Sequence, residues 1–227
     1  MGKSQYDILA DVLSRLNKSG VLEKVVLIGS WCLPLYRDNY FKGKTVSTLR
    51  TRDVDFLVGR NVKFRKKTDI PKLLEDMGFI PEHSYPDGHM RLTHPELIIE
   101  FLVPEAGRGS SKPYPLPELS MNAQRLRFLD ILYKDAITVD GFGLKINIPH
   151  PINFGLHKLL VLSRRGDTSK AAKDLEAGIS ILRLLVENGE GTKAKKTFDS
   201  LSKNQRKTIS QVFADHKIND LLELFHS

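Results

Sequence analysis

KVVLIGSW, residues 24–31, is a β-branched apolar run that ends in a Gly-Ser pair, and it decides the fold together with TRDVDFLV at 51–58. The second stretch sets Asp53 and Asp55 two residues apart inside another apolar run. A third run, ELIIEFLV at 96–103, contains one further acid between apolar residues. Short continuous apolar runs are typical of strands buried on both faces. We therefore predict three strands of one sheet that carry three carboxylates.

The three acids point to a metal site. Alternate side chains of a strand leave the same face, so Asp53 and Asp55 should lie on one face about 7 Å apart. Two such carboxylates repel each other unless a cation lies between them or one is protonated. Glu100, inside IIEFL, is costly to bury unless it is paired or bound to a metal. A hard divalent ion that prefers oxygen ligands, Mg²⁺ or Mn²⁺, would satisfy Asp53, Asp55 and Glu100 together.

A second interpretation stays open for the same acids. Nearby bases could neutralise them without any metal, and the sequence offers Arg50, Arg52 and Arg91 for that purpose. The combination of three acids with a Gly-Ser pair at the end of the first strand favours the metal interpretation.

The composition limits the class of protein. The chain has 227 residues, of which 41% are hydrophobic and 27% charged, and it has a single cysteine, Cys32. One cysteine excludes an internal disulfide framework and a thiolate zinc cluster. No apolar run approaches the roughly 18 to 20 residues that span a bilayer, and the first residues lack the apolar core of a signal peptide, so we expect a cytoplasmic protein without a membrane partner.

The formal net charge of +8 favours anionic partners such as nucleotides, nucleic acid or phosphorylated small molecules. Two runs supply much of the excess, one at 60–67 and one at 193–207. Such a run is more often a solvated face than a binding surface, and neither contains aromatic residues beyond Phe64 and Phe198.

The element pattern predicts an α+β protein: a mixed-sheet domain over residues 1–149, followed by an all-helical domain over 150–227. In the first domain we expect helices at 6–16, 30–36 and 69–77, strands at 24–29, 51–58, 79–85, 89–93, 96–103, 126–139 and 144–148, and a proline-rich surface loop at 104–117. In the second we expect helices at 151–164, 167–186, 193–201, 203–214 and 217–226. Asp69 and Asp167 should be N-caps, and Gly78 a helix stop.

This order of elements resembles the nucleotidyltransferase superfamily with the polymerase-β-like fold. The residues that carry the resemblance are Gly29-Ser30 in LIGSW, Asp53 and Asp55 in RDVDFLV, and Glu100 in IIEFLV. The motifs cover about residues 24–103, and the layout with a helical C-terminal part looks most like a bacterial branch whose activities are uncharacterised. The third acid departs from the pattern, because many members have Asp where this chain has Glu100.

The resemblance implies a Mg²⁺-dependent transfer of a nucleoside monophosphate from an NTP to an acceptor hydroxyl on a protein, an RNA or a small molecule. Gly29 and Ser30 would contact the triphosphate, and a basic residue of the first C-terminal helix, Lys158, would assist. Asp53, Asp55 and Glu100 would hold the metal, or Glu100 would act as the general base. A solvated surface position for Lys158 is an equal alternative.

Other residues give weaker predictions. The spacing of His83, His89 and His94 matches no zinc pattern. Trp31 and Tyr36 could stack on a base, although core packing is the commoner role of such residues. The string at 107–112 is expected to be a flexible basic loop, and Arg164, Arg165, Lys173 and Asp174 are weak candidates for lining the cleft.

The alternative function is that of a non-catalytic protein with the same fold, a regulator that binds nucleic acid or a partner.

Overall fold

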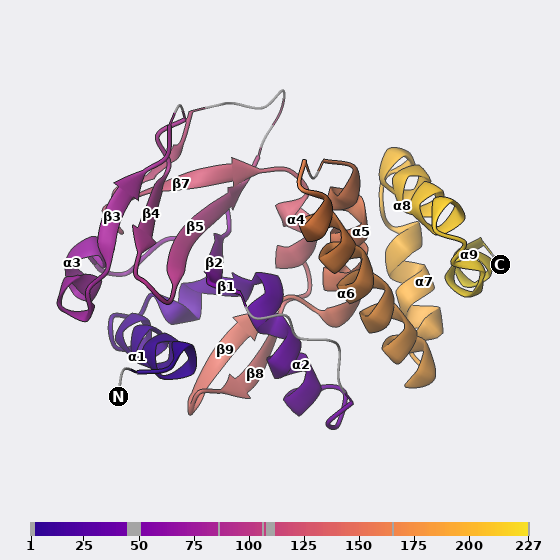
Figure 1. The fold of residues 1–227 in the computed structure, drawn as a ribbon, viewed down its shortest axis with the longest axis horizontal. Helices are drawn as coiled ribbons and strands as arrows, with labels where there is room; N and C mark the ends of the chain where they lie inside the picture. The colour runs from indigo at the N-terminus through magenta and orange to yellow at the C-terminus, as the bar shows by residue number, and fades with distance from the viewer. Residues whose placement is uncertain are drawn as a thin grey trace. The chain divides into compact units, whose positions relative to one another are not determined.

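The computed structural model describes residues 3–44, 51–85, 87–105, 107, 112–164 and 166–226. Its main sheet is mixed, as predicted, with the strand order β1-β2-β5-β4-β3 (Figure 1). β1 and β2 pair antiparallel, β2 and β5 pair parallel, and β7 pairs parallel with β5 and antiparallel with β6. The strands are β1 Val25–Ile28, β2 Asp53–Val58, β3 Ile80–His83, β4 Met90–Thr93, β5 Ile98–Pro104, β6 Tyr114–Leu116 and β7 Met121–Leu126. A separate hairpin pairs β8 Ile137–Gly141 with β9 Leu144–Ile148.

Local sequence signals set the first helices. α1 Gln5–Lys18 begins at a capping box in which Ser4 and Asp7 satisfy each other's backbone N–H groups. α3 Ile70–Leu74 has Asp69 as its N-cap, and a 3-10 turn carries it on to Met77. Gly78 follows with φ 87°, a left-handed conformation that glycine adopts without a Cβ clash. The predicted cap and stop of this helix are both confirmed.

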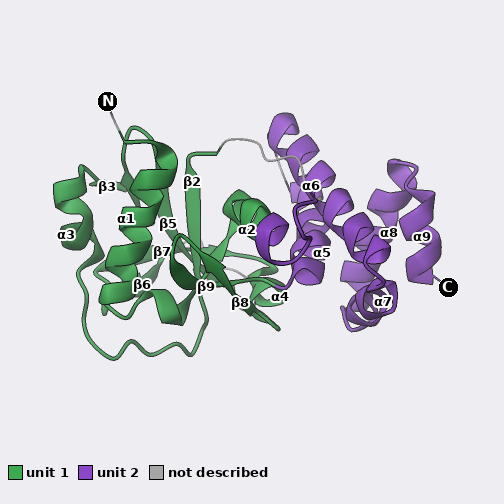
Figure 2. Ribbon diagram, turned by 90° about the horizontal axis from the view of Figure 1, so that it is seen from below, with its two compact units in different colours: residues 1–35, 50–149 green, residues 36–49, 150–227 purple. Residues whose placement is uncertain are grey.

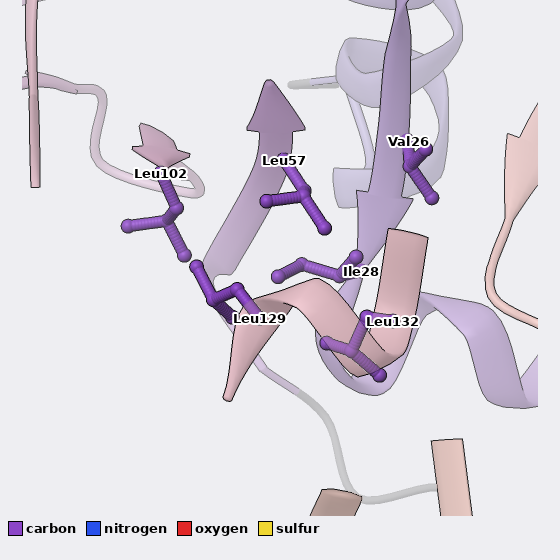
Figure 3. Packing of buried hydrophobic residues seen from close by; sticks show 6 residues of the cluster. All are labelled: Val26, Ile28, Leu57, Leu102, Leu129 and Leu132. Atoms are coloured by element: carbon purple, nitrogen blue, oxygen red, sulfur yellow. The ribbon is translucent and has the colours of Figure 1, made fainter. Parts of the chain in front are cut away.

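One face of the sheet is packed by α4 Leu129–Tyr133. Figure 3 shows leucines of this short helix against apolar side chains of β1, β2 and β5, and the six buried residues of the cluster are Val26, Ile28, Leu57, Leu102, Leu129 and Leu132. Val26 lies opposite Leu57 in the strand register, and Leu57 lies opposite Leu102. These three side chains therefore leave the same face and form the apolar surface on which α4 packs.

Two predictions of local structure were wrong. The segment 126–139 was expected to be one strand, but β7 ends at Leu126, α4 follows, and β8 begins at Ile137. Phe128, at φ 67°, turns the chain out of the strand before α4. The loop predicted at 104–117 contains β6, whose Leu116 is buried, and residues 106 and 108–111 of it lie outside the described residues.

The chain divides into two compact units, Met1–Leu35 with Arg50–Pro149, and Tyr36–Leu49 with His150–Ser227 (Figure 2). The division passes through α2 Cys32–Asn39, so the chain enters the second unit before it forms β2. The second unit is otherwise helical, with α5 Pro151–Val161, α6 Thr168–Glu187, α7 Gly191–Asp199, α8 Lys203–Asp215 and α9 Asn219–His226. Asp167 is the N-cap of α6, as predicted. Among the described residues, no helix has the length and apolar character needed to cross a membrane.

Small residues bring α5 and α6 together. A Cβ at Gly178 would lie 3.1 Å from the carbonyl oxygen of Gly155, and a Cβ at Gly155 would lie 2.9 Å from Leu182 Cγ. Neither position has room for a side chain, so the two glycines allow a close backbone contact between the helices.

The segment 36–44 is held to the helices of the second unit by polar contacts. The Tyr40 hydroxyl donates to Glu190 Oε2 at 2.8 Å, and Lys44 Nζ donates to Glu187 Oε2 at 3.2 Å. Tyr36 is fully buried and packs edge-on against Phe154 at 5.4 Å between ring centroids. These contacts explain why this segment groups with helices that come more than a hundred residues later.

Candidate active site

The three acids found in the sequence occupy neighbouring strands on one face of the sheet. Asp55 lies opposite Glu100 in the parallel register of β2 and β5, and Asp53 lies opposite Ile98. Residues that face each other across paired strands project to the same side. Asp53, Asp55 and Glu100 therefore leave the same face, which is the condition that a three-carboxylate site must meet.

This face is the one covered by α4, but the acids lie beyond the covered part. Leu57 and Leu102 come two residues after Asp55 and Glu100 and therefore leave the same face. Along each strand the side chains change from carboxylates to buried leucines. All three acids are intermediate in exposure, and the Glu100 side chain is 20% exposed. The three acidic residues are therefore partly accessible to solvent.

Gly29 closes the site on the side of β1. Ile28, the last residue of β1, lies opposite Asp55, and Gly29 then turns the chain with φ 78°. A Cβ at this position would lie 3.0 Å from Asp55 Oδ2. Only glycine combines the left-handed backbone with the space that the Asp55 carboxylate occupies. Ser30 follows in a 3-10 turn, Gly29–Trp31, that leads into α2.

His89, which directly precedes β4, contacts the Glu100 carboxylate. His89 is buried, with its Nε2 3.5 Å from Glu100 Oε1 and its Nδ1 3.1 Å from Asp87 Oδ2. Burial raises the pKa of the Glu100 carboxyl; His89 opposes this shift, the Asp53 carboxylate adds to it, and Arg91 opposes it. A negative charge on Glu100 is therefore costly without a nearby cation.

The side chains on this face are of the chemical type that a hard divalent cation prefers, although they are not arranged around one. Across the described residues, no group of three or more His, Cys, Asp or Glu side chains is close enough to hold a metal ion as it stands. The donors available on this face are carboxylate oxygens, the ligands that Mg²⁺ prefers. Glycine at residue 29 leaves the Asp55 carboxylate in its position, because a Cβ there would lie 3.0 Å from Oδ2.

The arginines that could neutralise the three acids make contacts with other groups. The Arg52 guanidinium donates to the carbonyl oxygen of His94 at 2.9 Å. Arg91 lies opposite Glu100 in the β4–β5 register, and its Nε is 3.8 Å from Glu82 Oε2. Arg50 lies outside the described residues. Arg91 thus lowers the pKa of Glu100 without making a close ion pair with it.

Lys158 lies in the second unit, on α5. Its ammonium donates to Asp174 Oδ1 at 2.5 Å and lies 5.4 Å from the Phe154 ring centroid. The Lys158 and Asp174 side chains are 12% and 8% exposed, so this is a buried ion pair rather than a solvated surface lysine. A role on the triphosphate stays a prediction for Lys158.

The aromatic candidates are core residues. Trp31 is 5% exposed and lies in a cluster with Tyr6 and Phe142, with ring centroids 5.3 and 6.5 Å away. Tyr36 is fully buried. The core alternative therefore holds for both. Of the weak cleft candidates, Arg165 lies outside the described residues.

The sequence interpretation missed His89 and Asp87 because it tested the three histidines only as a zinc cluster. The antiparallel register of β4 and β5 places Arg91 opposite Glu100, and His89 is two residues before Arg91 on that connection. Alternation along an extended segment predicts that His89 and Arg91 lie on one side, but only the strand register shows that this side is next to Glu100.

A mixed sheet that sets an Asp-x-Asp pair and a third acid on adjacent parallel strands, next to a glycine turn, defines the class of nucleotidyltransferase-fold proteins. The chain belongs to the nucleotidyltransferase family: the family model described as Nucleotidyltransferase matches residues 7–222.

The fold resembles that of a solved structure. An antigenic nucleotidyltransferase-like protein from Paracoccidioides brasiliensis is 14% identical, with a TM-score of 0.54 over 99% of this chain and 97% of that chain. The antibiotic-resistance factor ANT(2'')-Ia is 9% identical, with a TM-score of 0.45 over 95% and 96% of the two chains. No curated protein shows significant sequence similarity to the chain.

Proposed function

We propose that this protein transfers a nucleoside monophosphate from an NTP to a hydroxyl of an acceptor, with Mg²⁺ or Mn²⁺ as the cofactor and in the cytoplasm. The observation that carries the proposal is the register of Asp55 opposite Glu100, with Gly29 leaving space at the Asp55 carboxylate. Family membership supports the reaction class. The acceptor is a protein, an RNA or a small molecule.

In this proposal, Asp53, Asp55 and Glu100 would hold the divalent cation. When bound, such an ion neutralises charge on the triphosphate and lowers the pKa of an attacking hydroxyl. Gly29 would let the backbone come close to a phosphate, and the Ser30 hydroxyl would donate a hydrogen bond to a phosphate oxygen. In-line attack forms a bond from the acceptor oxygen to the α-phosphorus and breaks the bond to the leaving pyrophosphate.

Glu100 has one of two roles in this step. It is either the third metal ligand or the general base that accepts the proton of the acceptor hydroxyl. Its contact with His89, which in turn contacts Asp87, favours a fixed orientation of the carboxylate in either role. His89 is therefore a positioning residue in this proposal and not a catalytic one.

Lys158 contributes to triphosphate binding only if its ammonium exchanges Asp174 for a phosphate oxygen. Its buried ion pair at 2.5 Å makes that exchange costly, because the exchange breaks a close contact between two buried charges. The carboxylates and the glycine turn are thus the stronger part of the proposal.

A thermal-shift titration tests the proposal. A ligand that binds only the native state raises stability by about 2.7 kcal/mol at a hundredfold excess over Kd. We expect one or more NTPs with Mg²⁺ to raise Tm in the wild type and not in Asp53→Asn/Asp55→Asn. Asp140→Asn is the matched control, because Asp140 is exposed on the β8–β9 hairpin and pairs with Lys145. The proposal fails if no NTP shifts the wild type, or if the double variant shifts equally.

Incubation with α-labelled NTPs and acceptor candidates then separates an enzyme from a binding regulator. Transfer of label in the wild type, lost in Asp53→Asn/Asp55→Asn, supports the enzyme. A nucleotide-dependent rise in Tm without any transfer supports the non-catalytic alternative.

A further inference from the structure

Two adjoining cavities open at the far end of β2 from the carboxylates. The larger, about 820 Å³, lies against the start of β1, the residues that follow β2, and α4. The smaller, about 280 Å³, lies between the end of α1 and residues 64–66. Both are lined by Glu23, so they are neighbours. All of these elements belong to the first compact unit.

The charge of this surface is mainly positive. Its bases are Lys18, Lys24, Arg60, Lys63, Arg65 and Lys66, and its acids are Glu23, Asp130 and Asp135. Two of the acids form ion pairs with bases of the same surface. Lys24 Nζ is 3.4 Å from a Glu23 carboxylate oxygen, and Arg60 donates to Asp130 at 2.9 Å. The other four bases have no ion pair with a carboxylate of the described residues. Lys18, Lys63, Arg65 and Lys66 are all exposed.

Aromatic and amide groups lie among these bases. Tyr133 is 44% exposed and lines the larger cavity, and its ring covers Gly59, where a Cβ would come within 2.8 Å of it. Phe64 is partly exposed in the smaller cavity. Asn61 and Asn17 line the two cavities beside them. Such a surface has groups for phosphates, base faces and base edges.

This surface is separate from the candidate active site. Asp55 lies on β2 and Gly59 directly follows its last residue, so the two are about 13 Å apart at the rise of an extended chain. Leu129 and Leu132 of α4 belong to the same buried cluster as Leu57, which lies between Asp55 and Gly59 in the sequence (Figure 3). The bases therefore lie beyond the end of β2 that is farther from the carboxylates.

We propose that the surface formed by these two cavities binds the backbone of a single-stranded nucleic acid. Tyr133 and Phe64 lie among the bases and suit the faces of unstacked nucleobases, which a single strand exposes and a duplex does not. Of the large exposed hydrophobic residues in the described part of the chain, Tyr133 alone lines these cavities. One such side chain gives too little apolar surface for insertion into a bilayer. The proposal concerns binding and does not depend on the transfer reaction.

The probe is a fluorescein-labelled oligouridine, and the measurement is fluorescence anisotropy of the full chain without NTP. With about three phosphates neutralised, a slope near −0.7 per phosphate predicts a roughly 20-fold loss of affinity between 50 and 200 mM salt. Lys63→Glu/Arg65→Glu/Lys66→Glu should weaken binding at least about tenfold at low salt. The milder set Lys63→Gln/Arg65→Gln/Lys66→Gln should weaken it less, with a shallower salt slope.

The chain offers a control of equal charge. Lys196, Lys203 and Lys207 are exposed on the second basic run, and Lys196→Glu/Lys203→Glu/Lys207→Glu removes the same net charge. Retained binding in this control and loss in the first set support the proposal. Equal losses in both sets, no loss in the first set, or tighter binding to heparin, duplex RNA or phosphatidylserine vesicles than to oligouridine overturns it.

Discussion

Gly29 constrains the candidate site in two separable ways, through its backbone and through the space next to Asp55. Its φ of 78° disfavours any other residue by about 1–2 kcal/mol. A Cβ would also meet Asp55 Oδ2 at 3.0 Å and move that carboxylate. The first effect acts on stability and the second on the site.

Gly29→Ala should therefore lower the free energy of unfolding by about 1–2 kcal/mol and abolish the rise in Tm produced by NTP and Mg²⁺. Gly20→Ala is the control, since Gly20 has φ 76° with nothing within 4 Å of a Cβ. It should show a similar loss of stability in urea unfolding and keep the nucleotide response. Equal nucleotide responses in the two variants would refute the steric role of Gly29.

At the scale of elements, a surface ion pair ties α6 to α9. Arg183 donates to both oxygens of Asp220, at 2.8 and 3.0 Å, and holds the pKa of that carboxyl below 3.8. A depressed folded-state pKa adds stability above pH 3.8, and this stability is lost as the pH falls through the lowered value. The two side chains are 50% and 52% exposed, so solvent screening limits the contribution to less than about 1 kcal/mol.

Asp220→Asn should therefore reduce the stability of the helical unit at pH 7 by less than about 1 kcal/mol, and the difference from the wild type should disappear in acid. Urea unfolding followed by circular dichroism at both pH values measures this. Glu223→Gln, an exposed position on the same helix, should have little effect at either pH. A difference that persists in acid would show that the substitution acts through packing instead of through the ion pair.

Elements with strong local signals were predictable from the sequence. The strand with Asp53 and Asp55, the Asp69 cap and the helices after 150 all have a pattern that is decided within a few residues. The helix α4 was not predictable, because LDILY is too short for a helical period and its apolar residues equally suit a strand. The acids could be placed on faces by alternation, but His89 reaches Glu100 through a register that only strand pairing fixes.

At the scale of the whole molecule, residues 36–49 belong to a different unit from the strands on either side of them in the sequence. No local pattern carries this information, because the grouping rests on contacts such as Tyr40 with Glu190 and Tyr36 with Phe154. Sequence order alone assigns the segment to the first domain, residues 1–149. Its stability should instead follow that of the helices.

Hydrogen exchange of a destabilised variant tests this expectation. Phe213 is fully buried in the helical unit and stacks on Phe225 at 5.7 Å, and Phe213→Leu should cost on the order of 1 kcal/mol through imperfect packing. Amides of residues 36–44 should then exchange faster together with α5 to α8, while β1 and β2 keep their protection. Phe56→Leu, which loosens the Phe56–Phe101 contact of the sheet, is the mirror control and should expose β2 and β5 but not residues 36–44. If residues 36–44 respond to Phe56→Leu and not to Phe213→Leu, the segment is stabilised by the sheet and the division of the chain drawn from its contacts does not describe its unfolding.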